Sequence, residues 1–213
     1  MPDSPTLPGS DPDLDLVHRV RSGETQLFEL LMRRHNQRLF RVARVFAANA
    51  NEAEYIMQDA YVRAFTALDQ FEERARFSTW LTRIAINEAL ARCRRRRANT
   101  YDDVEQLMDT AHSPDDLASS AEVRRLLESA IAKLEEPFRL VFVLRAVEQL
   151  SVREVSECLD VEEGTVKTRY LRARATLKGV LAQHAEAIAP DLYDFHLQRC
   201  DRVVAHVMQI LPP

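Results

Sequence analysis

Basic, hydroxyl and apolar side chains share one arc of a predicted helix near the end of the chain. At about 100° per residue, this arc contains Lys167, Thr168, Leu171 and Arg172. Basic groups bind phosphates, a hydroxyl can reach base edges, and an apolar side chain can contact a thymine methyl group. The arc therefore has the chemistry to bind duplex DNA. The alternative is an ordinary amphipathic helix with a solvated basic face.

A shorter helix and a tight turn are predicted to position this arc. Ser151 and Glu154 have the spacing of a capping box, in which each side chain bonds the backbone amide of the other residue. Asp160 follows at a turn, where Asp tolerates left-handed geometry. A helix of about nine residues, a short turn and a longer helix have the proportions of a helix-turn-helix. The longer helix is expected to turn four residues inward: Val166, Tyr170, Ala173 and Leu177.

A second segment, Phe71–Arg97, has the composition expected for binding melted DNA. Phe77 and Trp80 precede four consecutive arginines at positions 94–97. Unpaired bases stack on aromatic rings while arginines neutralise the backbone. Asn87, on the helix between them, could read a base edge. Either ring could equally belong to the core, and Asn87 could be solvated.

A third candidate surface lies on the helix expected over residues 52–68. Its polar face contains Glu54 and Gln58, with Asp59 beside them. Such a face could dock a protein partner, or it could simply be a solvated acidic surface.

Apolar periodicity divides the chain into helical blocks. Residues 1–13 are expected to be a disordered tail, 14–97 a first helical domain and 98–120 an acidic linker without periodicity. Residues 121–182 then form a second helical domain that contains the helix-turn-helix. Residues 183–213 are a C-terminal extension.

The extension carries an apolar stripe at helical spacing: Leu197, Cys200, Val203, Val207 and Ile210. We expect this stripe to pack on the second domain, and we also consider a role in autoregulation or in docking a regulator. A zinc or redox site using Cys200 and nearby histidines is disfavoured because no close cysteine pair completes it. We therefore expect no metal and no cofactor.

Composition favours an all-α protein and disfavours an enzyme. Only 4 glycines are present, which is few for phosphate-binding loops or turn-rich sheets, and neither a His-Glu-x-x-His pattern nor a catalytic triad is evident. The net charge of −4 conceals +7 over residues 18–100 and −7 over residues 101–122. Basic blocks of this kind attract phosphate backbones.

The same sequence features favour a cytoplasmic location. The three cysteines are well separated and odd in number, which suggests free thiols in a reducing compartment. No apolar run is long enough for membrane insertion, and we expect no secretory signal at the N-terminus.

Several motifs in order resemble the extracytoplasmic-function (ECF, group IV) sigma factors of the sigma-70 family. They are Glu52-Ala53-Glu54-x-x-x-Gln58-Asp59, Phe77-Ser78-Thr79-Trp80-Leu81-x-Arg83-Ile84-Ala85-x-Asn87, Val141-Phe142-x-Leu144-Arg145, and Leu150-Ser151-x-x-Glu154-Val155 with Gly164-Thr165-Val166-Lys167-Thr168-Arg169-x-x-Arg172-Ala173-Arg174. The resemblance covers residues 14–97 and 121–181. Two departures are Tyr55, where the family most often has Asp, and the acidic turn at residues 160–163.

This resemblance implies a function in transcription initiation, and it implies sigma regions 2 and 4 for the two domains. The surface that binds the beta and beta-prime subunits of RNA polymerase core would comprise Glu54, Tyr55, Gln58 and Asp59. The minus-ten promoter element would be read by Phe71, Phe77, Trp80, Arg83 and Asn87. The minus-thirty-five element would be read by Thr165, Lys167, Thr168, Arg169, Leu171 and Arg172. The resemblance also implies an anti-sigma factor as partner and no small-molecule substrate.

Two other functions remain possible from the residues alone. An autonomous helix-turn-helix regulator would explain the second domain, but not the Phe71–Arg97 segment or the acidic linker. A helical adaptor that binds only proteins would leave the basic arc without a role. A sigma factor should bind promoters specifically only together with polymerase core, whereas a repressor would bind DNA alone.

Overall fold

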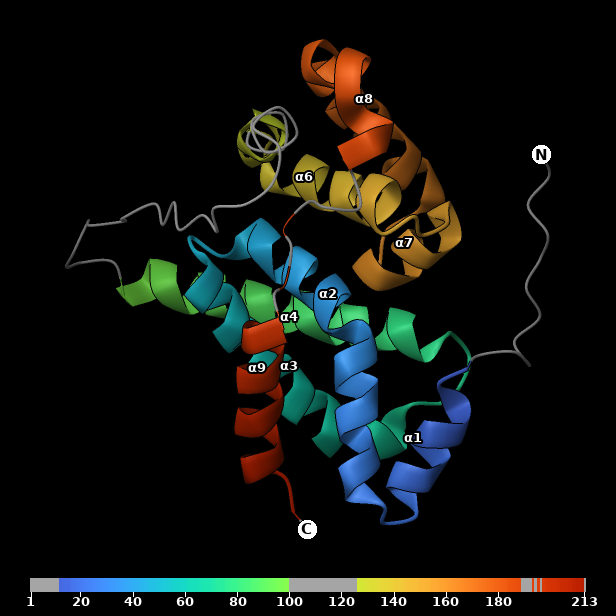
Figure 1. Ribbon diagram of the computed structural model, residues 1–213. Coiled ribbons are helices and arrows are strands. Elements are labelled where there is room, and N and C mark those ends of the chain that lie inside the picture. The colour runs from blue at the N-terminus through green and yellow to red at the C-terminus, as the bar shows by residue number, and fades with distance from the viewer. Residues whose placement is uncertain (1–11, 100–125, 189–192, 194, 196, 213) are drawn as a thin grey trace.

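The computed structural model describes residues 12–99, 126–188, 193, 195 and 197–212 (Figure 1). Within this part of the chain every regular element is helical, as expected. The predicted linker lies almost entirely outside the described residues, and so do residues 1–11 of the predicted tail. Asp13, which follows them, is buried and pairs with His35 at 2.7 Å.

The first helical block comprises α1 (Leu14–Arg21), α2 (Phe28–Phe46), α3 (Ala50–Thr66) and α4 (Phe77–Asn99). Apolar residues at helical spacing turn one face of each helix inward, and Leu31, Ile56 and Leu81 are fully buried. Asn49 caps α3 by accepting a hydrogen bond of 2.9 Å from the Glu52 amide. Helices α2, α3 and α4 pack against one another and form the core of this block.

The second block begins with a helical segment at 126–132 and continues through α6 (Glu136–Phe142). Pro137 lies in the first turn of α6, where its missing amide hydrogen costs nothing. A π-helical turn at Val143–Val147 follows, then α7 (Val152–Leu159) and α8 (Glu163–Ile188). Helix α8 packs on α6 and α7.

The expected helix-turn-helix is confirmed in its local details. The Ser151 hydroxyl accepts from the Glu154 amide at 3.1 Å, and the Glu154 carboxylate accepts from the Ser151 amide at 2.8 Å. Asp160 is left-handed, with φ 52° and ψ 50°. The inward face of α8 is also as expected, since Val166, Ala173 and Leu177 are buried and Tyr170 is partly buried.

Three expectations about helix ends and faces were wrong. The sequence predicts Ser78 as an N-cap, but α4 starts at Phe77, and the amides of Thr79 and Trp80 bond to the Arg76 carbonyl. The sequence also predicts that the long helix of the helix-turn-helix ends at Leu181, but α8 continues to Ile188 because no proline interrupts it before Pro190. In the C-terminal helix α9 (Leu197–Ile210), Leu197 is 79% exposed and Ile210 is 53% exposed, so the stripe is narrower than its apolar pattern suggests.

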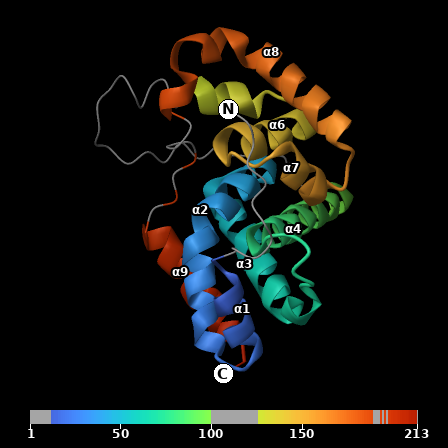
Figure 2. The ribbon, with the colours of Figure 1, turned by 90° about the vertical axis from the view of Figure 1, so that its right-hand side faces the viewer.

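Helix α4 lies on the side of the first block that faces the second, with α6, α7 and α8 on one side of it and α1, α3 and α9 on the other (Figures 1 and 2). Helix α9 packs on α3 and α2 of the first block. The expectation that its stripe packs on the second domain was therefore wrong. Residues at the end of the chain instead cover helices near its beginning.

Candidate nucleic-acid and protein interfaces

The basic arc of α8 lies on the molecular surface. Lys167, Thr168 and Arg172 are exposed, and the Leu171 side chain is 64% exposed. Lys167 has an intrahelical ion pair with Glu163 at 3.8 Å, which is a weak surface contact. Arg169 and Thr165 are half-buried at the edges of the arc. The four central side chains can therefore enter a groove without any repacking of the core.

The aromatic part of the second candidate surface is largely core. Phe71 and Phe77 are buried, and their rings meet edge to face with centroids 5.6 Å apart. Trp80 is half-buried against both, at centroid distances of 5.3 Å and 5.7 Å. Arg83 and Asn87 are exposed one and two turns further along α4. The part of this surface that is not buried therefore comprises Trp80, Arg83 and Asn87, whereas Phe71 and Phe77 are closed off from a nucleic acid.

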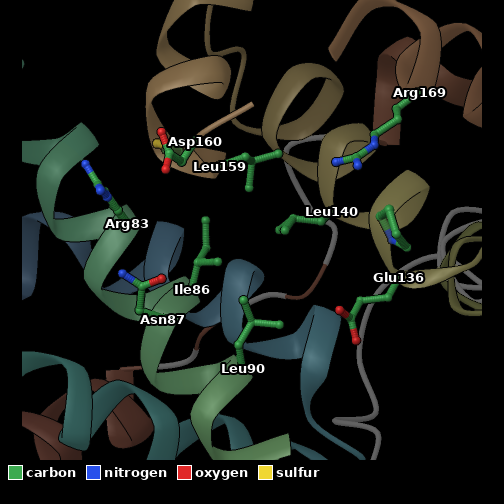
Figure 3. Close-up of a pocket in the computed structure, with 11 residues that line it drawn as sticks. Arg83, Ile86, Asn87, Leu90, Glu136, Leu140, Leu159, Asp160 and Arg169 are labelled. Carbon is green, nitrogen blue, oxygen red and sulfur yellow. The ribbon is translucent and has the colours of Figure 1, made fainter. Parts of the chain in front are cut away.

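The second block covers part of this α4 surface. Helix α7 packs on α4, and the Cys158 thiol lies 3.5 Å from the Thr79 carbonyl oxygen. A cavity of about 270 Å³ is lined by residues of α4, α6, α7 and the start of α8 (Figure 3). Arg83 and Asn87 face it from α4, opposite Asp160 and Arg169. Arg169, at the edge of the basic arc, thus faces the polar α4 surface across one cleft.

A buried ion pair that the sequence analysis missed joins the two blocks. The Glu148 carboxylate follows the π-helical turn and accepts from Arg38 at 3.1 Å and from Arg41 at 3.0 Å, both on α2. The Glu148 side chain is only 6% exposed. The acidic character of Glu148 did not predict this contact, because both arginines are more than 100 residues away in the sequence.

The acidic face of α3 is divided between exposed and covered residues. Tyr55 is 55% exposed and lies under Arg92 of α4, while Asp59 is 3.6 Å from the same arginine. Gln58 is half-buried. Glu54 is only 7% exposed, because Arg199 and Arg202 of α9 cover and pair with its carboxylate. These two arginines flank the apolar stripe, but nothing in their spacing indicated which acid they bind.

Other kinds of site find no support in the described residues. There, no three His, Cys, Asp or Glu side chains come together as metal ligands. Among the described helices, none has both the length and the apolar character needed to span a bilayer. His196 and the side chain of His184 lie outside the described residues.

The three cysteines are buried and form no disulfide, which leads to a reactivity prediction. Burial raises the pKa of the Cys158 thiol to about 12, so at pH 8 it should be almost entirely the unreactive thiol. Because the pKa of Cys158 is higher in the folded protein than in the unfolded chain, the protonated thiol stabilises the folded state. This contribution to the free energy of unfolding is complete below about pH 9 and declines between pH 9 and 12. Iodoacetamide at pH 8 should therefore modify no cysteine in the native protein and all three in urea, as counted by mass spectrometry. Rapid native labelling of Cys158 would contradict its burial between α7 and α4.

Comparison with known families accounts for both helical blocks. Residues 31–99 match the sigma-70 region 2 family, and residues 124–177 match the sigma-70 region 4 family. The chain is 31% identical over 173 residues to the ECF RNA polymerase sigma factor SigW of Bacillus subtilis, with 76% of this chain and 92% of that protein aligned. This chain belongs to the ECF sigma factors of the sigma-70 family. It is also 30% identical over 176 residues to the ECF RNA polymerase sigma-E factor of Escherichia coli K12, covering 78% of this chain and 92% of the relative.

Two solved structures share the fold of this chain. CnrH in complex with the cytosolic domain of CnrY has a TM-score of 0.60 and 28% sequence identity, and the match covers 81% of this chain and 98% of that chain. The sigma factor RpoE, in complex with the anti-sigma factor NepR from Bartonella quintana, shares the fold with a TM-score of 0.57 and 20% identity. That match covers 78% of this chain and 99% of that chain. In this sigma factor, α9 lies outside both family matches.

Proposed function

We propose that this sigma factor directs promoter-specific initiation by binding RNA polymerase core together with the minus-ten and minus-thirty-five promoter elements. The observation that carries the proposal is the presence, on one chain, of an exposed basic arc on a helix-turn-helix and a polar α4 surface beside Trp80. A sigma factor must engage duplex and melted DNA at separate sites, and these two surfaces suit those two tasks. The protein would recruit and direct the polymerase without catalysing a reaction itself, and it would act in the cytoplasm.

The residue assignments follow from this function. We assign core binding to Glu54, Tyr55, Gln58 and Asp59 of α3. We assign recognition of duplex DNA to six residues of α8: Thr165, Lys167, Thr168, Arg169, Leu171 and Arg172. The part of the minus-ten surface that is not buried comprises Trp80, Arg83 and Asn87. The buried rings of Phe71 and Phe77 would pack against Trp80 and hold it in position. We assign residues 14–97 to region 2, 121–182 to region 4 and 183–213 to the extension.

Packing of the second block on α4 bears on how the protein is regulated. Arg83 and Asn87 face the second block across the cleft, so the two blocks must separate before both promoter elements can be bound. A partner that stabilises the closed arrangement would hold the protein inactive. The complex of the structural relative RpoE with an anti-sigma factor supports such a partner here, and we propose a cognate anti-sigma factor.

The proposed function predicts that specific DNA binding depends on polymerase. With purified bacterial core, the protein should retard a subset of promoter fragments and support run-off transcription from them. Without core it should show no specific retardation, because the acidic turn at Glu162 and Glu163 weakens phosphate binding and α4 is partly covered. Core with no sigma factor is the control for non-specific initiation. Specific retardation of duplex DNA by the protein alone, without any binding to core, would instead establish an autonomous regulator.

A further inference from the structure

Helix α9 is seated on the first helical block by a continuous apolar stripe. Its 14 residues bury Cys200, Val203, Val204 and Val207 against α2 and α3. These positions follow the i, i+3, i+4, i+7 spacing of one helical face. Figure 2 shows α9 beside α2, on the face away from α4. The contact is a packed helix-on-helix interface between the end of the chain and its first domain.

Charged contacts fix the position of α9 along α3. Arg202 donates to both carboxylate oxygens of Glu54, at 2.9 Å and 3.1 Å, and Arg199 pairs with the same carboxylate. Two guanidinium groups on a nearly buried carboxylate form a strong and directional contact. On the opposite edge, Asp201 pairs with Arg33 of α2 at 2.7 Å. These pairs specify one register for a stripe that could otherwise slide.

The segment before α9 is also held by α2. The Gln37 side chain donates to the Tyr193 carbonyl at 2.8 Å and accepts from the Phe195 amide at 2.9 Å. The Phe195 ring packs on Phe40 with centroids 4.7 Å apart. The described residues of the extension thus dock at several points, as expected for an element with a defined place.

This docking site overlaps the surface assigned to polymerase core. Glu54 and Gln58 lie one turn apart on α3, and α9 pairs with Glu54 and contacts α3. The Glu54 carboxylate cannot be enclosed by two α9 arginines and also face a bound subunit. We propose that α9 is an autoinhibitory helix that competes with polymerase core for the α3 surface. This inference rests on the proposed function and adds an intramolecular control to it.

A reversible disulfide tests the proposal in the full-length protein. The Asn36 amide nitrogen lies 2.9 Å from the Cys200 sulfur, so Asn36→Cys places a second thiol beside the native one. Oxidised Asn36→Cys, with the disulfide verified by mass, should bind immobilised core at least about tenfold more weakly than the same protein after reduction. The double variant Asn36→Cys/Cys200→Ser is the control, and its core binding should not respond to oxidation. Equal core binding by the oxidised and the reduced protein would overturn the proposal.

Charge reversal should produce the opposite effect. Arg199→Glu/Arg202→Glu replaces two attractive contacts with repulsion from Glu54 and should tighten core binding about tenfold by releasing α9. Gln198→Glu/Gln209→Glu adds negative charge at exposed positions of the same helix and should leave core affinity unchanged. Equal core binding by the disulfide-locked, reduced and charge-reversed forms would refute autoinhibition but not the proposed function. Absence of core binding in every form would refute the proposed function itself.

Discussion

Replacing Lys167 and Arg172 together with alanine should lower the affinity of the polymerase-bound sigma factor for promoters with a minus-thirty-five element by about 30-fold or more. Both side chains lie on the exposed arc of α8 and can reach a major groove without rearrangement. An arginine that reads a base edge and a lysine that contacts a phosphate each contribute directly to binding. The loss should be measured by filter binding or retardation on a promoter fragment, at several salt concentrations.

Salt dependence separates the two contributions of this double variant. If Lys167 neutralises a phosphate, Lys167→Ala alone should reduce the slope of log affinity against log salt by about 1. Lys133→Ala/Lys178→Ala removes two exposed lysines outside the assigned contacts, and it should cost little affinity. The unfolding midpoint should not move in any of these variants, because none of the three lysines nor Arg172 is buried. Equal affinity losses in the two double variants would exclude the α8 arc as the reading surface.

The second large effect is expected at the ion pair that joins the two helical blocks. Glu148→Ala should lower the free energy of unfolding by about 2 kcal/mol, because it leaves the Arg38 and Arg41 guanidinium groups without this carboxylate in a largely buried site. The Arg38 side chain retains 25% exposure, so solvent screens part of the loss. Small-angle scattering should also show a larger radius of gyration, since the pair holds the second block against α2. Urea unfolding provides the stability measurement.

Glu157→Ala is the matched control for this prediction. Its carboxylate pairs at 2.9 Å with Arg153, whose side chain is 78% exposed, and because solvent screens such a surface pair its loss should cost far less stability than the loss of Glu148. If Glu148→Ala were no more destabilising than Glu157→Ala and had the same radius of gyration, the packing of the second block on the first would not depend on the ion pairs of Glu148. If Glu148→Ala opens the molecule, Arg83 and Asn87 should become more accessible to DNA.

The contrast between α8 and α9 shows how far a local pattern can be read. The capping box of Ser151, the left-handed Asp160 and the inward Val166 were all predicted and are confirmed. Each depends on hydrogen bonds or side-chain spacing within about one helical turn, so the neighbouring residues specify it. The family resemblance was also carried by such local motifs, and the comparisons confirm it.

The tertiary contacts of the candidate surfaces could not be predicted in the same way. The pattern around Phe71 and Phe77 suits stacked bases and a hydrophobic core equally well, and only packing against His35 and Trp80 shows that both rings are buried. The acidic α3 surface was predicted, but the cover that α9 places over Glu54 was not. A charged side chain identifies the sign of its partner, not the partner's place in the chain.

The helical class, the helix-turn-helix and the basic arc could all be predicted, because they depend on residues that are close together along the chain. The folded chain was needed to show that α9 rests on α2 and α3, that the second block closes over α4, and that Glu148 joins Arg38 and Arg41. An apolar stripe is compatible with many complementary faces, because hydrophobic burial has no direction. The choice among those faces comes from the shape and charge of surfaces that meet only when the whole chain folds.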